Sequence, residues 1–397
     1  MGNTPLGWAA ENGHQGVVEI LLARDDIDPN KSGEGGQTPL ILAAYNGHEG
    51  VVKMLLSRDD VYPNKSDEDG QTALSYASEN GHEGVVEMLL GRDDINPNKP
   101  DEYGQTPLLL ATSNWYEGVV KMLLSRNDID PDKSDEDGET PLFVATLNGH
   151  EGIVEILLGR DDINPNKSDS RGRTPLSVAA DQGDQGIVRM LLGRGDLDPN
   201  KPRKDGDTFL RWAAKKGNEG VVKMLLGRDD VDPNMLDIQN RTPLWWAACI
   251  GRVGVVKMLL ARADVNPNTP DEDGQTPLSC AAEGGHEGVV DILLTRDDID
   301  PNKSGDDGRT PLMLAVCEGH EEVVDVLLAC DDVDPNKPDN DDRTPLWWAA
   351  RNGKERVVEM LLGRGDVNSR TPDKNGSTPL GCAISNVHYE VWELLRD

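Results

Sequence analysis

Few side chains of this 397-residue chain could perform acid–base or nucleophilic chemistry, and they follow a fixed spacing. Its seven histidines are separated by multiples of 34 residues, at His14, His48, His82, His150, His286, His320 and His388. No histidine lies outside that series to act as a general base or a metal ligand. Neither a nucleophile elbow nor a phosphate-binding glycine pattern is present. We therefore predict that the chain is not an enzyme and holds no cofactor.

The oxygen-rich loops and the cysteines do not predict a metal site either. The loop that starts at Asp26 alternates oxygen ligands as a calcium-binding loop does, but Lys31 stands at the obligatory glycine and Gln37 at the bidentate glutamate. The cysteines are odd in number and lack metal spacing, at Cys249, Cys280, Cys317, Cys330 and Cys382. A reduced, intracellular chain is the simplest expectation.

The regular spacing reflects an internal repeat. The threonine of one recurring Thr-Pro-Leu signal stands every 34 residues without an insertion, at Thr4, Thr38, Thr72, Thr106, Thr140, Thr174, Thr208, Thr242, Thr276, Thr310, Thr344 and Thr378. A constant period of this length is typical of a stack of supersecondary units, each of which buries its apolar face against its neighbours.

One unit, Asp271 to Ser304, predicts a tight turn and two short antiparallel helices. Thr276 is placed to cap the first helix, and Pro277 takes its first position, where a missing N–H costs nothing. Gly284 and Gly285 end that helix. The second helix is apolar on most sides and should be largely buried between repeats.

These residues resemble the ankyrin repeat, whose pattern of Thr-Pro-Leu, paired alanines, Gly-His, paired valines and paired leucines is complete from Gly36 to Leu56. The resemblance implies an all-α repeat solenoid of stacked helix-turn-helix units with short β-hairpin-like loops. We expect one domain over residues 1–397, with eleven 34-residue units in the Thr4 phase and a partial repeat at 378–397.

The chain departs from the ankyrin pattern in two ways. The histidine that usually follows Thr-Pro-Leu is absent, so the hydrogen bonds it makes between repeats must be made otherwise or lost. The linker reads RDDIDPN and is one residue longer than usual, as in fungal multi-repeat proteins. In the fourth repeat Trp115 and Tyr116 replace Gly-His, which predicts either local repacking or an exposed aromatic anchor.

Composition limits the partners. The formal net charge of −32 disfavours nucleic acid and anionic membranes, which are bound by clustered Lys and Arg. It also disfavours tight self-association, so we expect a monomer. No apolar run approaches the ~20 residues that span a bilayer. The chain starts inside a repeat without a leader, so we expect no signal peptide and a piece of a longer protein.

Repeats six to eight, which depart most from the common pattern, predict a partner-binding site. Basic and apolar residues gather there at positions that line the concave face of ankyrin proteins, and similar residues return in the eleventh repeat. A basic patch in an acidic array favours an acidic peptide or protein. The predicted contacts are Arg171, Arg173, Arg203, Lys204, Arg211, Lys215, Lys216, Arg241, Trp245, Ile250, Arg343, Trp347 and Arg351.

Two interpretations of function stay open at this point. The first is a protein–protein interaction module that binds a partner on its concave face. The second is a structural spacer or sensor arm of a larger protein, such as one with a nucleotide-binding switch domain. The uniform early repeats favour the spacer, and the irregular repeats six to eight favour recognition. Trp8, Trp212, Trp246 and Trp348 share one phase with aliphatic residues elsewhere, which predicts core packing.

Overall fold

The computed structural model describes residues 4–202 and 206–396. These residues form 24 α-helices and one 3₁₀ turn (η1, Glu34–Gly36), and no strand is found among them. Contacts divide the chain into two compact units, Met1–Asp198 and Pro199–Asp397. The predicted all-α solenoid of helix pairs is confirmed within each unit, whereas the expectation of one continuous domain stays a prediction.

In the first unit, the first helix of each repeat is α1 (Pro5–Glu11), α3 (Pro39–Tyr45), α5 (Ala73–Glu79), α7 (Pro107–Ser113), α9 (Pro141–Leu147) or α11 (Pro175–Gln182). The second helix of each repeat is α2 (Gln15–Leu22), α4 (Glu49–Leu56), α6 (Glu83–Leu90), α8 (Glu117–Leu124), α10 (Glu151–Leu158) or α12 (Gln185–Leu192).

In the second unit, the first helices are α13 (Phe209–Lys216), α15 (Pro243–Cys249), α17 (Pro277–Glu283), α19 (Pro311–Glu318), α21 (Pro345–Arg351) and α23 (Pro379–Ser385). The second helices are α14 (Glu219–Leu226), α16 (Val253–Leu260), α18 (Glu287–Leu294), α20 (Glu321–Ala329), α22 (Glu355–Gly363) and α24 (Tyr389–Leu395).

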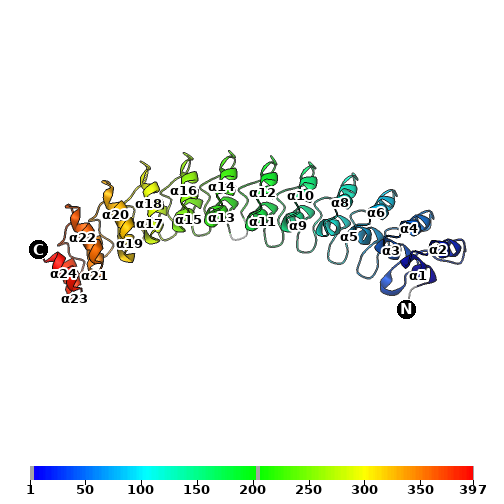
Figure 1. Cartoon of the computed structure of the whole chain (residues 1–397), viewed down its shortest axis with the longest axis horizontal. Coiled ribbons are helices and arrows are strands. Elements are labelled where there is room, and N and C mark those ends of the chain that lie inside the picture. The colour runs from blue at the N-terminus through cyan, green and yellow to red at the C-terminus, as the bar shows by residue number, and fades with distance from the viewer. Residues whose placement is uncertain (1–3, 203–205, 397) are drawn as a thin grey trace. The chain divides into compact units, whose positions relative to one another are not determined.

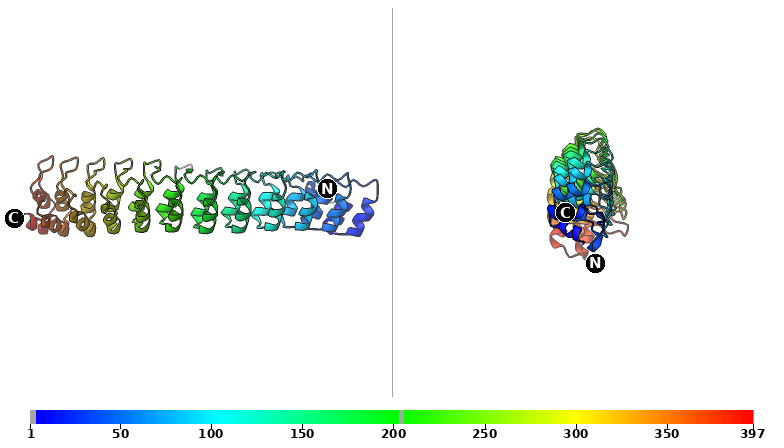
Figure 2. Two further views of the ribbon diagram at one scale, coloured as in Figure 1. Left: turned by 90° about the horizontal axis from the view of Figure 1, so that it is seen from above. Right: turned by 90° about the vertical axis from the view of Figure 1, so that its right-hand side faces the viewer.

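Within each unit, first helices pack on first helices and second helices on second helices, in two rows (Figure 1). The loops that connect successive repeats project from one side of the helices (Figure 2). In each second helix from α4 to α22, two adjacent β-branched residues and at least one leucine are buried and form the core between the rows; Val85, Val86 and Leu89 are completely buried. In the terminal helices α2 and α24 only Val18 and Val391 are buried. None of the helices in the described part of the chain is long and apolar enough to cross a membrane.

The predicted helix starts are confirmed. The Oγ1 atom of Thr276 accepts a hydrogen bond from the backbone N–H of Ser279 at 3.1 Å, and Pro277 occupies the first turn. A side-chain oxygen at this position satisfies one of the N–H groups that a helix start leaves free. The same cap recurs in the first helix of every repeat.

The linker makes its own side-chain hydrogen bonds between repeats, away from the position of the missing histidine. Asn64 donates from Nδ2 to the carbonyl oxygen of Asp94 at 2.6 Å, and its Oδ1 accepts from the N–H of Asn96 at 2.7 Å. Arg92 pairs with the Asp94 carboxylate at 2.8 Å and reaches back to the carbonyl oxygen of Leu56. The RDDIDPN linker is therefore a polar ladder that joins each repeat to the next.

The turn between paired helices needs a residue in the left-handed conformation, which favours glycine. Gly47 has a φ of 71°, and a Cβ there would lie 2.7 Å from Nδ1 of His82 in the next repeat. Trp115 takes the same position with a φ of 71°, so the backbone turn is not rebuilt. Its ring is 66% exposed and lies 4.1 Å from the imidazole of His150, whose Nε2 has no hydrogen-bond partner.

Candidate partner-binding surface

The predicted contact residues are divided between the two units. Arg171 and Arg173 belong to the first unit, and Arg203 and Lys204 lie outside the described residues. Arg171 is exposed. Arg173 pairs with Asp169 at 2.7 Å, which leaves little of its charge for a partner. The other predicted residues belong to the second unit.

Arg211 is a correction to the prediction, because its side chain lies inside the protein. The residue is 5% exposed, and its guanidinium pairs with the carboxylate of Asp207. Its Nη1 atom also lies 2.8 Å from Oδ2 of Asp237, in a direction that makes a charge contact but no hydrogen bond. A cation held by two carboxylates stabilises the stack and offers no charge to a partner.

Asp237 is the centre of a buried polar cluster in the eighth repeat. Its Oδ2 accepts from Nε of Arg241 at 2.9 Å and from Nε1 of Trp246 at 3.2 Å. Burial lowers the pKa of Arg241 from its usual value, yet an arginine stays protonated at neutral pH. The carboxylate thereby fixes both a cation and an aromatic ring at the surface of α15.

The ring of Trp246 carries two cations on its surface. The Nζ atom of Lys215 lies 3.7 Å from the ring centroid, and the guanidinium carbon of Arg241 lies 4.2 Å from it. A small cavity of about 200 Å³ opens beside this cluster, lined by Asp207, Arg211, Lys215, Asp237, Ile238, Gln239, Arg241 and Trp246. Three cations face two carboxylates there, so the cavity has one positive charge in excess. Lys216 is exposed and Ile250 half-buried at the ends of α13 and α15.

Trp245 and Trp347 are a second correction, since both indoles pack between repeats. They are 7% and 5% exposed. Trp245 donates from Nε1 to the carbonyl oxygen of Gln275 at 3.0 Å, and Trp347 donates to that of Ser377 at 3.1 Å. A large aromatic side chain fills the place of the missing histidine and replaces its hydrogen bond to the next repeat.

The eleventh repeat keeps one predicted cation exposed. Arg343 pairs with Asp339 at 2.8 Å and with Asp341 at 2.6 Å. Arg351 is exposed, and its guanidinium carbon lies 5.4 Å from the ring centroid of Trp347. The prediction that the other tryptophans pack in the core is confirmed for Trp212 and Trp348, which are 9% and 8% exposed. It is wrong for Trp8, which is 56% exposed, and for Trp246, which is half-buried at the surface of α15.

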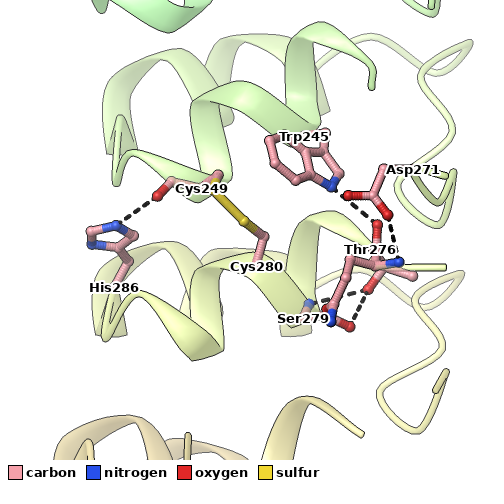
Figure 3. The surroundings of a disulfide bond; sticks show 8 residues. Trp245, Cys249, Asp271, Thr276, Ser279, Cys280 and His286 are labelled. Atoms are coloured by element: carbon pink, nitrogen blue, oxygen red, sulfur yellow. Dashed lines mark hydrogen bonds between the residues drawn. A yellow bond between two sulfur atoms is a disulfide. The ribbon is translucent and has the colours of Figure 1, made fainter. Parts of the chain in front are cut away.

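A disulfide between Cys249 and Cys280 joins the eighth and ninth repeats, with the two Cα atoms 4.9 Å apart (Figure 3). The expectation of five reduced thiols is therefore wrong for this pair. The sequence feature that could have predicted this pair is the repeat register, because residues 31 positions apart contact each other between adjacent first helices. Tyr45 and Tyr76 meet edge to face at these positions, with ring centroids 5.3 Å apart, and Lys215 contacts the ring of Trp246 at the equivalent positions across the eighth repeat's boundary.

The disulfide borders an acidic cavity of about 570 Å³. Its lining is Arg241, Trp245, Cys249, Asp271, Asp273, Gln275, Cys280, Glu283, Asp306 and Asp307. Five carboxylates face one guanidinium that already pairs with Asp237. Burial raises the pKa of Asp271 above its usual value. No group of three metal-ligating side chains suited to an ion is found in the described residues.

The comparisons with known proteins agree with this architecture. The family model of ankyrin repeats (3 copies) matches residues 1–67, 59–135, 116–203, 194–271, 260–339 and 330–397. The chain therefore belongs to the ankyrin repeat family, whose members are in general protein–protein interaction modules rather than enzymes. No curated protein matches the chain.

Proposed function

We propose that the second unit binds an acidic segment of a partner protein on the face formed by its first helices and loops, the concave face of ankyrin proteins. The observation that carries this proposal is the Lys215 ammonium on the ring of Trp246, beside a cavity with excess positive charge. Arg241 lies on the same ring but pairs with Asp237. A cation held against an aromatic ring is partly desolvated, and a partner carboxylate gains more from it than from a fully hydrated lysine.

Lys215 and Lys216 are the proposed main contacts, and Ile250 supplies adjacent apolar surface. Neither lysine has an ion pair with a carboxylate comparable to that of Arg211 or Arg343. Charges that are already paired inside the protein add little to recognition, whereas free cations both steer a partner and bind it. Arg351 is a separate proposed contact on the eleventh repeat, and the exposed Arg171 is one on the first unit.

The test compares three forms of the full chain as baits in a native extract. The first is the parent, the second carries Lys215→Glu and Lys216→Glu, and the third carries Lys223→Glu and Lys257→Glu. The control lysines are exposed on the second helices α14 and α16, so both variants change the charge equally. A captured protein is then titrated against each purified bait by calorimetry.

We expect the parent and the control to bind the partner with similar affinity. The Lys215/Lys216 variant should bind it with an affinity at least tenfold lower. Equal affinity of all three baits would place the contact elsewhere and contradict the proposed site. Capture by none of them would favour the alternative function, a spacer or sensor arm. The alternative is supported by the identical sequences of three second helices, since α4, α8 and α14 all read EGVVKMLL. Identical helices give a partner no surface by which to tell one repeat from another.

A further inference from the structure

We propose that the Cys249–Cys280 disulfide is a thiol-exchange site that reacts preferentially with thiols carrying positive charge. The proposal does not depend on the acidic partner proposed above, because it concerns the neighbouring cavity of opposite charge. It rests on three features of the described residues: the place of the bond in the repeat register, the unequal exposure of its two cysteines, and the carboxylates around it.

The repeat stack does not need this bond to hold its geometry. In other repeats the same two positions are joined by an edge-to-face contact between Tyr45 and Tyr76, and by a cation–π contact between Lys215 and Trp246. The backbone at Cys249 keeps its own link to the ninth repeat, since Nε2 of His286 donates to its carbonyl oxygen at 3.0 Å (Figure 3). Opening the disulfide therefore leaves the two repeats in contact.

The two cysteines line the same cavity but differ in exposure. Cys249 is half-buried at the last residue of α15, whereas Cys280 lies within α17 and is 7% exposed. An incoming thiolate therefore attacks Sγ of Cys249, the bond to Cys280 breaks, and Sγ of Cys280 leaves with the electron pair and takes a proton from water. The product is a mixed disulfide on Cys249 and a thiol on Cys280.

A second thiol of the same kind completes the exchange. Its thiolate attacks the external sulfur of the mixed disulfide and releases Cys249 as a thiol. Two external thiols are thereby oxidised to one disulfide while the protein bond is reduced to two thiols. A small disulfide such as oxidised glutathione closes the bond again by the reverse steps. The site is thus reversible in either direction, according to the thiol–disulfide ratio around it.

The carboxylates determine which thiols react well. Asp273, Glu283 and Asp306 are exposed at the cavity beside the disulfide, and Arg241 is its one cation. A concave surface with one sign of charge raises the local concentration of opposite charge and lowers that of like charge, at low salt by tenfold or more. A thiolate that also carries an ammonium or guanidinium group thus approaches Cys249 more easily than an anionic thiolate.

The test measures how fast the disulfide opens in the oxidised full chain, by alkylation of Cys249 and Cys280 followed by mass spectrometry. The probes are cysteamine, β-mercaptoethanol and mercaptoethanesulfonate, whose reactive forms carry net charges of zero, minus one and minus two. Each rate is divided by the rate of the same thiol with hydroxyethyl disulfide, which removes intrinsic reactivity. A peptide with one cysteine between arginines, and the same peptide with aspartates, represent a protein thiol.

We expect the normalised rate to fall in the order cysteamine, β-mercaptoethanol, mercaptoethanesulfonate, with about a tenfold span at low salt that disappears near 1 M salt. The variant Asp273→Asn, Glu283→Gln, Asp306→Asn should lose most of this span. The matched control Glu287→Gln, Asp291→Asn, Glu321→Gln changes exposed carboxylates of the second helices α18 and α20 and should keep it.

Two results would overturn the proposal. The first is equal normalised rates for the three thiols at low salt. The second is alkylation of all five cysteines in the chain after treatment with oxidised glutathione, without any reductant. The peptides distinguish the two sources of a cationic thiol. A mixed disulfide on Cys249 that forms faster with the arginine peptide supports a protein partner, whereas a preference shown by cysteamine alone restricts the site to small thiols.

Discussion

The eighth and eleventh repeats contain the same eight residues, RTPLWWAA, at 241–248 and 343–350, and several side-chain contacts are the same in both. In both, the two indoles meet edge to face with centroids 5.3 Å apart, and the first indole donates to a carbonyl oxygen 30 residues later. The next residue differs. Cys249 forms a disulfide with the ninth repeat, whereas Arg351 covers the indoles at the surface.

This difference separates two roles within one repeat. The segment that begins at the capping threonine and ends at the second alanine determines the packing, and it gives the same geometry wherever it occurs. The residue after the second alanine lies at the surface between repeats and determines the local chemistry. A repeat protein of this kind therefore changes its surface at one position without disturbing its core.

The largest expected effect is a loss of unfolding free energy when the buried carboxylate of either repeat, Asp237 or Asp339, is removed. Asp237→Ala removes the shared partner of Arg211, Arg241 and Trp246, and should cost about 3–5 kcal/mol of unfolding free energy because buried Arg211 loses one of its two carboxylates and two further donors lose their acceptor. Asp339→Ala leaves Arg343 with Asp341 and should cost about 1.5–3 kcal/mol. Urea unfolding followed by circular dichroism measures both. Equal losses would show that Arg211 needs only Asp207.

The next effect concerns the disulfide. Cys249→Ala with Cys280→Ala should destabilise the oxidised chain by about 3–4 kcal/mol, because the bond closes a loop of 31 residues in the unfolded chain. The melting temperature of the parent should fall on reduction, and that of the variant should not respond to reductant. A parent whose melting temperature is the same in both conditions would contradict a stabilising bond. The variant Cys317→Ala is the control for reagent effects.

A smaller effect tests whether the two interiors are equivalent. Trp245→Phe and Trp347→Phe each remove one N–H donor and some buried apolar surface, and each should cost about 1–3 kcal/mol. Since the two indoles donate to equivalent carbonyl oxygens and are buried to a similar extent, the losses should agree within about 0.5 kcal/mol in matched urea titrations. Clearly unequal losses would mean that the disulfide beside Trp245 changes how that repeat responds to a lost contact.

The smallest effect concerns the surface position in the eleventh repeat. Arg351→Ala removes a cation from the exposed side of two indoles and should cost about 0.5–1 kcal/mol, less than the loss of the disulfide at the equivalent position. Raising the salt concentration should reduce the cost of Arg351→Ala only slightly, because Arg351 contacts aromatic rings and pairs with no carboxylate among the described residues. If Arg351→Ala lost as much unfolding free energy as the double cysteine variant, residue 351 would contribute to the packing of the stack and not only to its surface.

Much of the fold could be predicted from the sequence. The threonine cap, the proline after it and the glycine turn are local signals, because each acts on backbone within a few residues of itself. Their strict recurrence predicted the helix pairs and the stacked architecture. The same reasoning predicted less of the candidate surface. Lys215 and Lys216 are accessible, but Arg211, Trp245 and Trp347 are buried.

The sequence by itself thus determined the repeat, the helices and the strongly acidic character of the chain. The tertiary structure alone decided which charges remain available and which cysteines pair. The pairing of Arg211 with Asp237, or of Cys249 with Cys280, joins residues about 30 positions apart in different repeats. Such contacts depend on how one helix pair is rotated and spaced against the next, and the local backbone preferences that a sequence displays do not specify that arrangement.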